Sequence, residues 1–178
     1  MIDYEFIGEL EGNSLVGYVP EPDGGAIESG VTIASGFDLG QRHGYELIGL
    51  PDHLVDLLAP YCNMTGYDAI NFLQVNPLEI TQEEADHINE FAHSQSEHYL
   101  VQDWEDWSMI SWDDLTDRQQ TVVASVAFQY GDLPTRTPNF WRQVTSGQWG
   151  DAVTNLRDFG DNYPTRRNKE ADYLCNII

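Results

Sequence analysis

The sequence predicts an α+β fold in which a lead helix and a small antiparallel sheet are followed by a helical bundle. Three observations support it: an amphipathic stretch opens the chain, β-branched and glycine-rich segments follow, and helical periodicity then continues to the end. The 178 residues are 41% apolar and 12% aromatic, which suits one domain with a substantial core. We therefore expect a single domain over residues 1–178, with a small β lobe at 12–42, a mainly helical lobe at 43–178, and a cleft between the lobes.

The first predicted element is a helix over residues 2–11 that packs with the helical lobe. Ile2, Phe6 and Leu10 recur at four-residue spacing and form one apolar stripe. The helix ends at Gly12, because glycine readily takes the conformation that terminates a helix.

The residue pattern after this helix predicts a small antiparallel sheet. Segments 14–19 and 30–37 are short runs rich in β-branched and aromatic residues. They flank the proline- and glycine-rich segment 20–25, which favours a turn. On a strand over 30–37, Thr32 and Gly36 would share one face by alternation, and small residues on that face would let a ligand lie close.

From about residue 43 onward the pattern is helical. Thr81 and Glu84 have the spacing of a capping box, which opens a long helix to about residue 103. A run that is apolar nearly all round predicts a buried central helix that ends at Gly131. The other predicted helices cover residues 51–59, 65–73, 139–147, 148–159 and 164–178.

The charge balance excludes several classes of partner. Thirty acidic side chains face eight basic ones, for a net charge of -22. Nucleic acids and anionic membranes are bound through Lys and Arg, so we expect neither as a partner. The N-terminus is acidic and lacks the basic and apolar regions of a secretory signal. We therefore expect the protein to be made in the cytoplasm without a signal peptide of its own.

Two carboxylates are candidates for acid–base chemistry. Glu11 ends the lead helix where the lobes should meet, and partial desolvation there would suit a general acid. Asp38 follows a strand and lies near glycines, on the opposite lip of the expected cleft. Glycosidic cleavage needs such a pair, one acid and one carboxylate that activates water. The alternatives are that Glu11 is one of thirty surface acids, that Asp38 caps the next element, and that Thr32 is an ordinary strand residue.

The order of these motifs resembles that of the phage-lysozyme and pesticin-like muramidases, which have the lysozyme-like fold. The N-terminal part of the resemblance is Glu11-Gly12-x5-Tyr18 followed by Thr32-x5-Asp38. The C-terminal part includes four further segments, at residues 127–131, 140–141, 147–156 and 162–167. The resemblance implies that Glu11 is the general acid, that Thr32 helps to place the attacking water, and that Arg166 pairs with Glu11.

One position departs from the phage-type pattern. That pattern has its catalytic aspartate in the turn before the threonine, where this chain has Pro20. Asp23 lies in the same turn and is the alternative second carboxylate. Asp38 matches the pesticin-like order instead, and we favour it over Asp23.

The resemblance implies hydrolysis of the β-1,4 bond between N-acetylmuramic acid and N-acetylglucosamine in peptidoglycan, without a cofactor or metal. The five histidines lack ligand spacing, and we expect Cys62 and Cys175 to be buried free thiols. The expected partners are a peptidoglycan strand and a cognate immunity or inhibitor protein, and the chain should be a monomer. It would act in the periplasm or wall of a target cell, as an endolysin or a delivered toxin domain. A catalytically silent module that binds glycan or a partner, and a chitinase-like hydrolase, remain alternatives.

Overall fold

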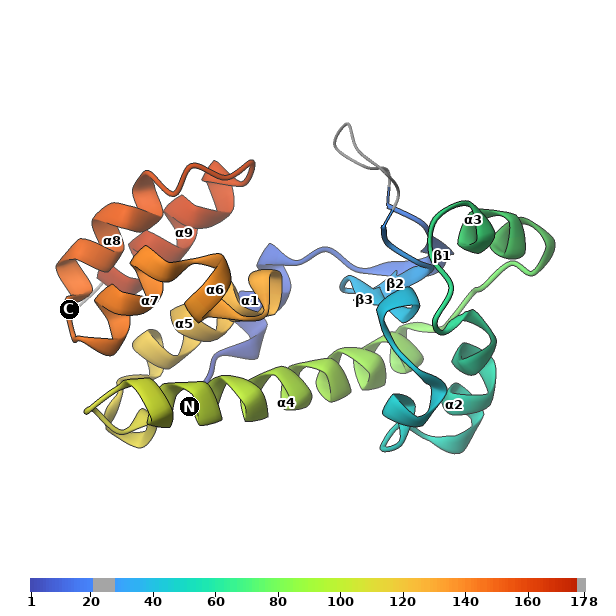
Figure 1. Cartoon of the computed structure of the whole chain (residues 1–178), viewed down its shortest axis with the longest axis horizontal. Coiled ribbons are helices and arrows are strands. Elements are labelled where there is room, and N and C mark those ends of the chain that lie inside the picture. The colour runs from blue at the N-terminus through green and yellow to red at the C-terminus, as the bar shows by residue number, and fades with distance from the viewer. Residues whose placement is uncertain (21–27, 176–178) are drawn as a thin grey trace. The chain divides into compact units, whose positions relative to one another are not determined.

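The computed structural model describes residues 1–20 and 28–175 (Figure 1). It confirms the α+β fold, with a lead helix, a small antiparallel sheet and a succession of helices. The chain forms two compact units, one of Met1–Leu10 with His93–Ile178 and the other of Glu11–Ala92. The second unit extends to Ala92, whereas the sequence predicts a β lobe that ends at residue 42.

The boundary differs because the helices that follow the sheet share its core. Leu54, Leu58, Ala69 and Ile88 are fully buried in one cluster with Ile33 of the sheet. Periodicity along the sequence identifies such helices but not the surface against which their apolar sides pack.

The sheet of the 11–92 unit has three antiparallel strands in the order β1 (Ser14–Tyr18), β2 (Thr32–Ala34) and β3 (Phe37–Asp38). The predicted strand over 30–37 is interrupted between β2 and β3. Ala34 and Gly36 have φ of 53° and 93°, which turn the chain back on itself. Our expectation that Gly36 shares a strand face with Thr32 is therefore wrong, since Gly36 lies in the connecting turn.

Short helical elements complete this unit. Their bounds are η1 (Leu39–Gln41), η2 (Gly44–Leu47), α2 (Asp52–Leu58), η3 (Ala59–Tyr61) and α3 (Gly66–Val75). α4 (Gln82–Trp107) begins in this unit and ends in the other. The predicted capping box is confirmed, since the Thr81 amide donates to Glu84 at 2.7 Å and the Glu84 amide donates to the Thr81 hydroxyl at 3.2 Å.

The other unit begins with α1 (Tyr4–Leu10), which starts two residues later than predicted. The Asp3 carboxylate accepts the Phe6 amide at 2.9 Å and thereby satisfies a donor in the first turn. Ile2 and Ile7 lie in the core of this unit, so the lead helix packs with the helical part as expected. Glu11 falls just outside the helix.

The central helix α5 (Asp117–Tyr130) is buried over most of its length, as its apolar sequence predicts. It is followed by α6 (Leu133–Arg136), α7 (Pro138–Thr145), α8 (Trp149–Arg157) and α9 (Pro164–Cys175), and η4 (Trp112–Asp114) precedes it. Figure 1 shows α7, α8 and α9 side by side, in agreement with their shared core. No helix in the described residues is both long and apolar enough to cross a bilayer.

Four tryptophans stabilise this core. Trp104 packs edge-on against Trp112 and Trp141 and is stacked with Trp149 at 6.5 Å between ring centroids. Trp104 and Trp112 are buried, so they serve the core rather than an exposed sugar platform. Cys62 is half-buried and Cys175 is exposed, so the expectation of two buried thiols is wrong, although both are free.

Candidate functional site

The two faces of the sheet differ in character. Ile33 and Phe37 are register partners and lie in the core of the 11–92 unit. Thr32 and Asp38 are the adjacent pair of partners, and alternation places them on the other face. Side chains of directly opposed residues lie on the same side, with Cβ atoms about 5 Å apart. The structure therefore brings together two of the residues that the sequence identified.

Asp38 is held by backbone amides. Its Oδ1 accepts the Gly30 N–H at 3.0 Å and the Gly40 N–H at 2.9 Å. The second bond caps η1, so the capping role considered for Asp38 is observed. Both bonds fall on one oxygen, and among the described residues no hydrogen-bond donor contacts Oδ2. The carboxylate is thus fixed at one oxygen and half-exposed.

Glycine is required at both amide donors. A Cβ on Gly30 would lie 2.3 Å from the Gly40 Cα and 2.4 Å from the Met64 carbonyl oxygen. A Cβ on Gly40 would meet the same backbone atoms of Gly30 and Met64 at 2.5 and 2.6 Å. Three backbone segments therefore converge beside Asp38 at distances that only glycine permits.

Thr32 contributes a buried hydroxyl to the same face. The side chain is 3% exposed, and its Oγ1 donates to the Gly30 carbonyl at 3.3 Å. Because the hydroxyl proton is used in this bond, the oxygen lone pairs are directed elsewhere and can accept a hydrogen bond from a water molecule. Such an acceptor beside a carboxylate suits the placement of water.

Tyr18 lies beside this pair. It is the β1 partner of Thr32, and 41% of its surface is exposed. The sequence motif includes Tyr18, but we assigned it no role because a single tyrosine on a strand gives no functional signal.

Glu11 is the first residue of the 11–92 unit, which also contains Thr32 and Asp38. It is half-buried and follows α1 directly. The next residue, Gly12, has a φ of 38° and turns the chain from the helix toward β1. Asp23, the alternative carboxylate, lies outside the described residues.

Arg166 belongs to α9, in the other unit. Its Nε donates to Glu170 at 3.1 Å, and its Nη2 donates to the Ser125 carbonyl at 2.9 Å. These bonds fix the guanidinium within the helical unit. The pairing of Arg166 with Glu11 stays a prediction.

Sequence reasoning missed a buried ionic network around Arg166. Arg167 is 1% exposed and donates to Asp161 at 2.8 Å, to Glu170 and to Gln129. Burial lowers the pKa of Arg167, but the charge of Glu170 and the bonds to both carboxylates outweigh burial, so its pKa is raised. Glu170 follows Arg166 and Arg167 by four and three residues, and this helical spacing was the available signal.

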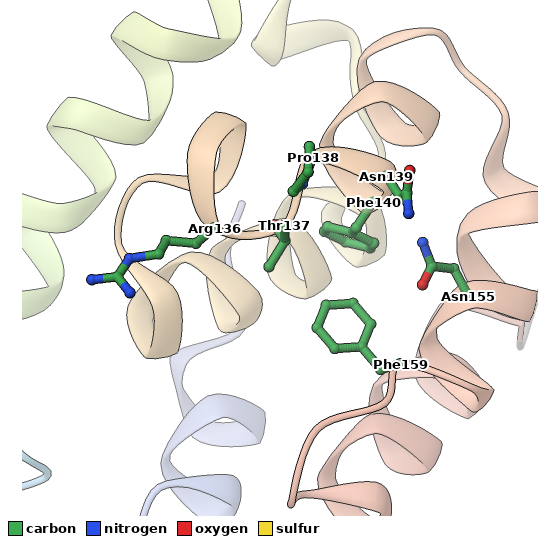
Figure 2. Close-up of a pocket in the computed structure, with 7 residues that line it drawn as sticks. All are labelled: Arg136, Thr137, Pro138, Asn139, Phe140, Asn155 and Phe159. Carbon is green, nitrogen blue, oxygen red and sulfur yellow. The ribbon is translucent and has the colours of Figure 1, made fainter. Parts of the chain in front are cut away.

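A separate cavity of about 160 Å³ lies in the helical unit (Figure 2). Figure 2 shows the rings of Phe140 and Phe159 next to one another, with Asn139 and Asn155 beside them, and the two rings meet edge to face at an interplanar angle of 72°. Asn155 is held by a 2.8 Å bond from its amide nitrogen to Gln143. The lining residues are Arg136, Thr137, Pro138, Asn139, Phe140, Asn155 and Phe159. No candidate catalytic residue is among them, so this cavity is distinct from the sheet site.

Within the described residues, no group of three or more His, Cys, Asp or Glu side chains is arranged to hold a metal ion.

The profile of the pesticin family, described as a bacterial toxin homologue of phage lysozyme, C-terminal part, matches residues 1–150. The chain belongs to the pesticin family. Its α+β structure is accordingly of the lysozyme-like type, and its class at family level is that of lysozyme-type glycoside hydrolases acting on peptidoglycan. The match includes Glu11, Thr32 and Asp38, whereas Arg166 lies beyond it. No curated protein matched the chain.

Proposed function

We propose that the chain is a muramidase that cleaves the β-1,4 bond between N-acetylmuramic acid and N-acetylglucosamine in peptidoglycan. One observation carries the proposal: Thr32 and Asp38 oppose each other on the sheet face opposite to Ile33 and Phe37. They lie in the same compact unit as Glu11, and all three fall within the family match.

The proposed reaction uses one acid and one base. The protonated Glu11 donates its proton to the leaving glycosidic oxygen as the bond to the anomeric carbon breaks. A water molecule placed by Thr32 attacks that carbon from the opposite face, and Asp38 accepts its proton. Bound through Oδ1, Asp38 would present Oδ2 to the water. The product has an inverted anomeric carbon, and each turnover leaves Glu11 ionised and Asp38 protonated until they exchange protons with solvent.

Mass spectrometry of digested peptidoglycan tests the proposal. Wild type should release muropeptides that end in reducing N-acetylmuramic acid, and Glu11→Gln should release none. Glu9→Gln, which neutralises an exposed acid of α1, is the matched control and should act like wild type. Because the net charge of -22 repels anionic wall polymers, moderate salt should raise the rate.

The same assay separates the alternatives. Faster cleavage of chitin oligomers than of peptidoglycan would indicate a chitinase-like hydrolase. Retained glycan binding without products at any salt concentration would refute the muramidase and indicate a catalytically silent module.

The proposed setting is the wall of a target cell, reached by a delivered toxin domain, since the family is described as a bacterial toxin homologue. A producer of such an enzyme would need an inhibitor protein. Expression in a bacterium with an added export signal should cause lysis, whereas the same chain retained in the cytoplasm should not. Equal survival of both cultures would contradict this setting.

A further inference from the structure

Tyr18 extends the candidate site along the sheet. Thr32 is the register partner of Tyr18 on one side and of Asp38 on the other. The three residues therefore form a row across β1, β2 and β3. The row passes from an exposed aromatic ring through a buried hydroxyl to a half-exposed carboxylate.

A second observation places the Tyr18 side chain on the same face as Thr32 and Asp38. A Cβ on the neighbouring Gly17 would lie 3.0 Å from the Leu78 Cβ and 3.3 Å from the Leu73 side chain. Gly17 thus faces the core, and alternation along β1 directs Tyr18 to the opposite side. The register of β1 against β2 shifts between Ser14 and Tyr18, so the side of Tyr18 follows from Gly17 and from the pairing of Tyr18 with Thr32.

This combination suits an amino sugar. A pyranose ring has an apolar C–H face that packs on an aromatic ring, while its hydroxyl and acetamido groups require polar partners. Tyr18 on β1 and Asp38 on β3 are separated by β2, so the two residues lie about 10 Å apart, because adjacent strands are roughly 4.8 Å apart. A sugar ring fits within that span.

We propose that Tyr18 is a substrate-contacting residue whose ring packs against an N-acetylhexosamine unit next to the bond that is cleaved. The inference rests on the muramidase function proposed above. Tyr18 takes no part in proton transfer, so its contribution is to glycan affinity rather than to the chemical step.

Kinetics on soluble peptidoglycan fragments test this role. Tyr18→Ala should raise KM about tenfold and leave kcat within about twofold, since a lost aromatic contact weakens binding by roughly this factor. Tyr18→Phe keeps the ring and should resemble wild type. Tyr67→Ala is the matched control, because Tyr67 is 75% exposed in the same unit but lies on α3. Circular dichroism checks that each variant is folded.

A binding measurement tests the Tyr18 contact separately from the proposed muramidase activity. Calorimetry with the N-acetylglucosamine hexamer, on the Glu11→Gln background, reports affinity without turnover. Tenfold weaker binding in Tyr18→Ala supports the contact even if wild type proves inactive. Unchanged affinity and KM in Tyr18→Ala, or an equal loss in Tyr18→Phe, would overturn it while leaving the muramidase assignment intact.

Discussion

Substitution of Gly30 or Gly40 by alanine should destabilise the 11–92 unit. The added Cβ of Gly30→Ala would lie 2.3 Å from the Gly40 Cα and 2.4 Å from the Met64 oxygen. Carbon atoms normally approach to about 3.5–4.0 Å, so the backbone segments must separate by more than an ångström. Overpacking of this kind costs about 1–3 kcal/mol, and weakening an amide bond to the Asp38 carboxylate adds about 1.5–3 kcal/mol. We expect a loss of about 3–5 kcal/mol, a large part of a typical stability of about 5–15 kcal/mol.

Urea unfolding combined with amide hydrogen exchange measures this loss. Exchange is needed because the two compact units need not unfold together, and it reports the 11–92 unit directly. Gly44→Ala is the matched control, since its nearest neighbour would be the Ala59 Cβ at 3.9 Å, and it should change stability by less than about 1 kcal/mol. A change below about 0.5 kcal/mol in both Gly30→Ala and Gly40→Ala would refute the close-packing argument.

Two further predictions concern charged groups of the helical unit. Glu170→Ala leaves the buried Arg167 without one partner and should cost about 3–5 kcal/mol in urea unfolding, whereas Asp172→Ala removes an exposed ion pair and should leave the unfolding curve close to that of wild type. Equal losses in the two variants would contradict the role of burial. Hydrogen bonds from the Phe6 amide and, second, from the Tyr173 hydroxyl lower the pKa of Asp3 in the folded protein below its ordinary value of 3.8. The ionised Asp3 carboxylate therefore stabilises the fold at pH values above 3.8, and this stabilisation is lost as the pH falls from 3.8 through the lowered pKa. Thermal unfolding between pH 7 and pH 2 should therefore show a smaller acid-induced drop in Tm for Asp3→Asn than for wild type, and parallel curves would contradict the linkage.

Much of the structure could be predicted because it depends on local sequence. Capping at Thr81 and Glu84 involves residues three apart, and the apolar run over 122–127 predicts the buried centre of α5. Such features need no knowledge of distant contacts. The pairing of Thr32 with Asp38 was not predicted, because it depends on the turn at Ala34 and Gly36 that divides the expected strand over 30–37.

Other features depend on contacts that no periodicity reveals. Gly30 and Gly40 are required because the Met64 carbonyl approaches them, and it belongs to a segment more than twenty residues away. The network of Glu170 joins α9 to Ser125 of α5, so its burial becomes evident only when both helices are in place. The extent of the 11–92 unit was likewise set by packing onto the sheet rather than by a signal in the sequence.

The capping role of Asp38 and its proposed catalytic role support each other, and a pair of variants separates them. An asparagine Oδ1 can accept the same two amide bonds from Gly30 and Gly40, so Asp38→Asn should keep the fold while losing the base that takes a proton from water. Asp38→Ala loses both roles and should also destabilise the 11–92 unit by about 1–2 kcal/mol, as the loss of a cap does. We expect both variants to be inactive on peptidoglycan, with wild-type hydrogen exchange in Asp38→Asn alone. Activity near that of wild type in Asp38→Asn would show that Asp38 only positions the backbone and that the base lies elsewhere.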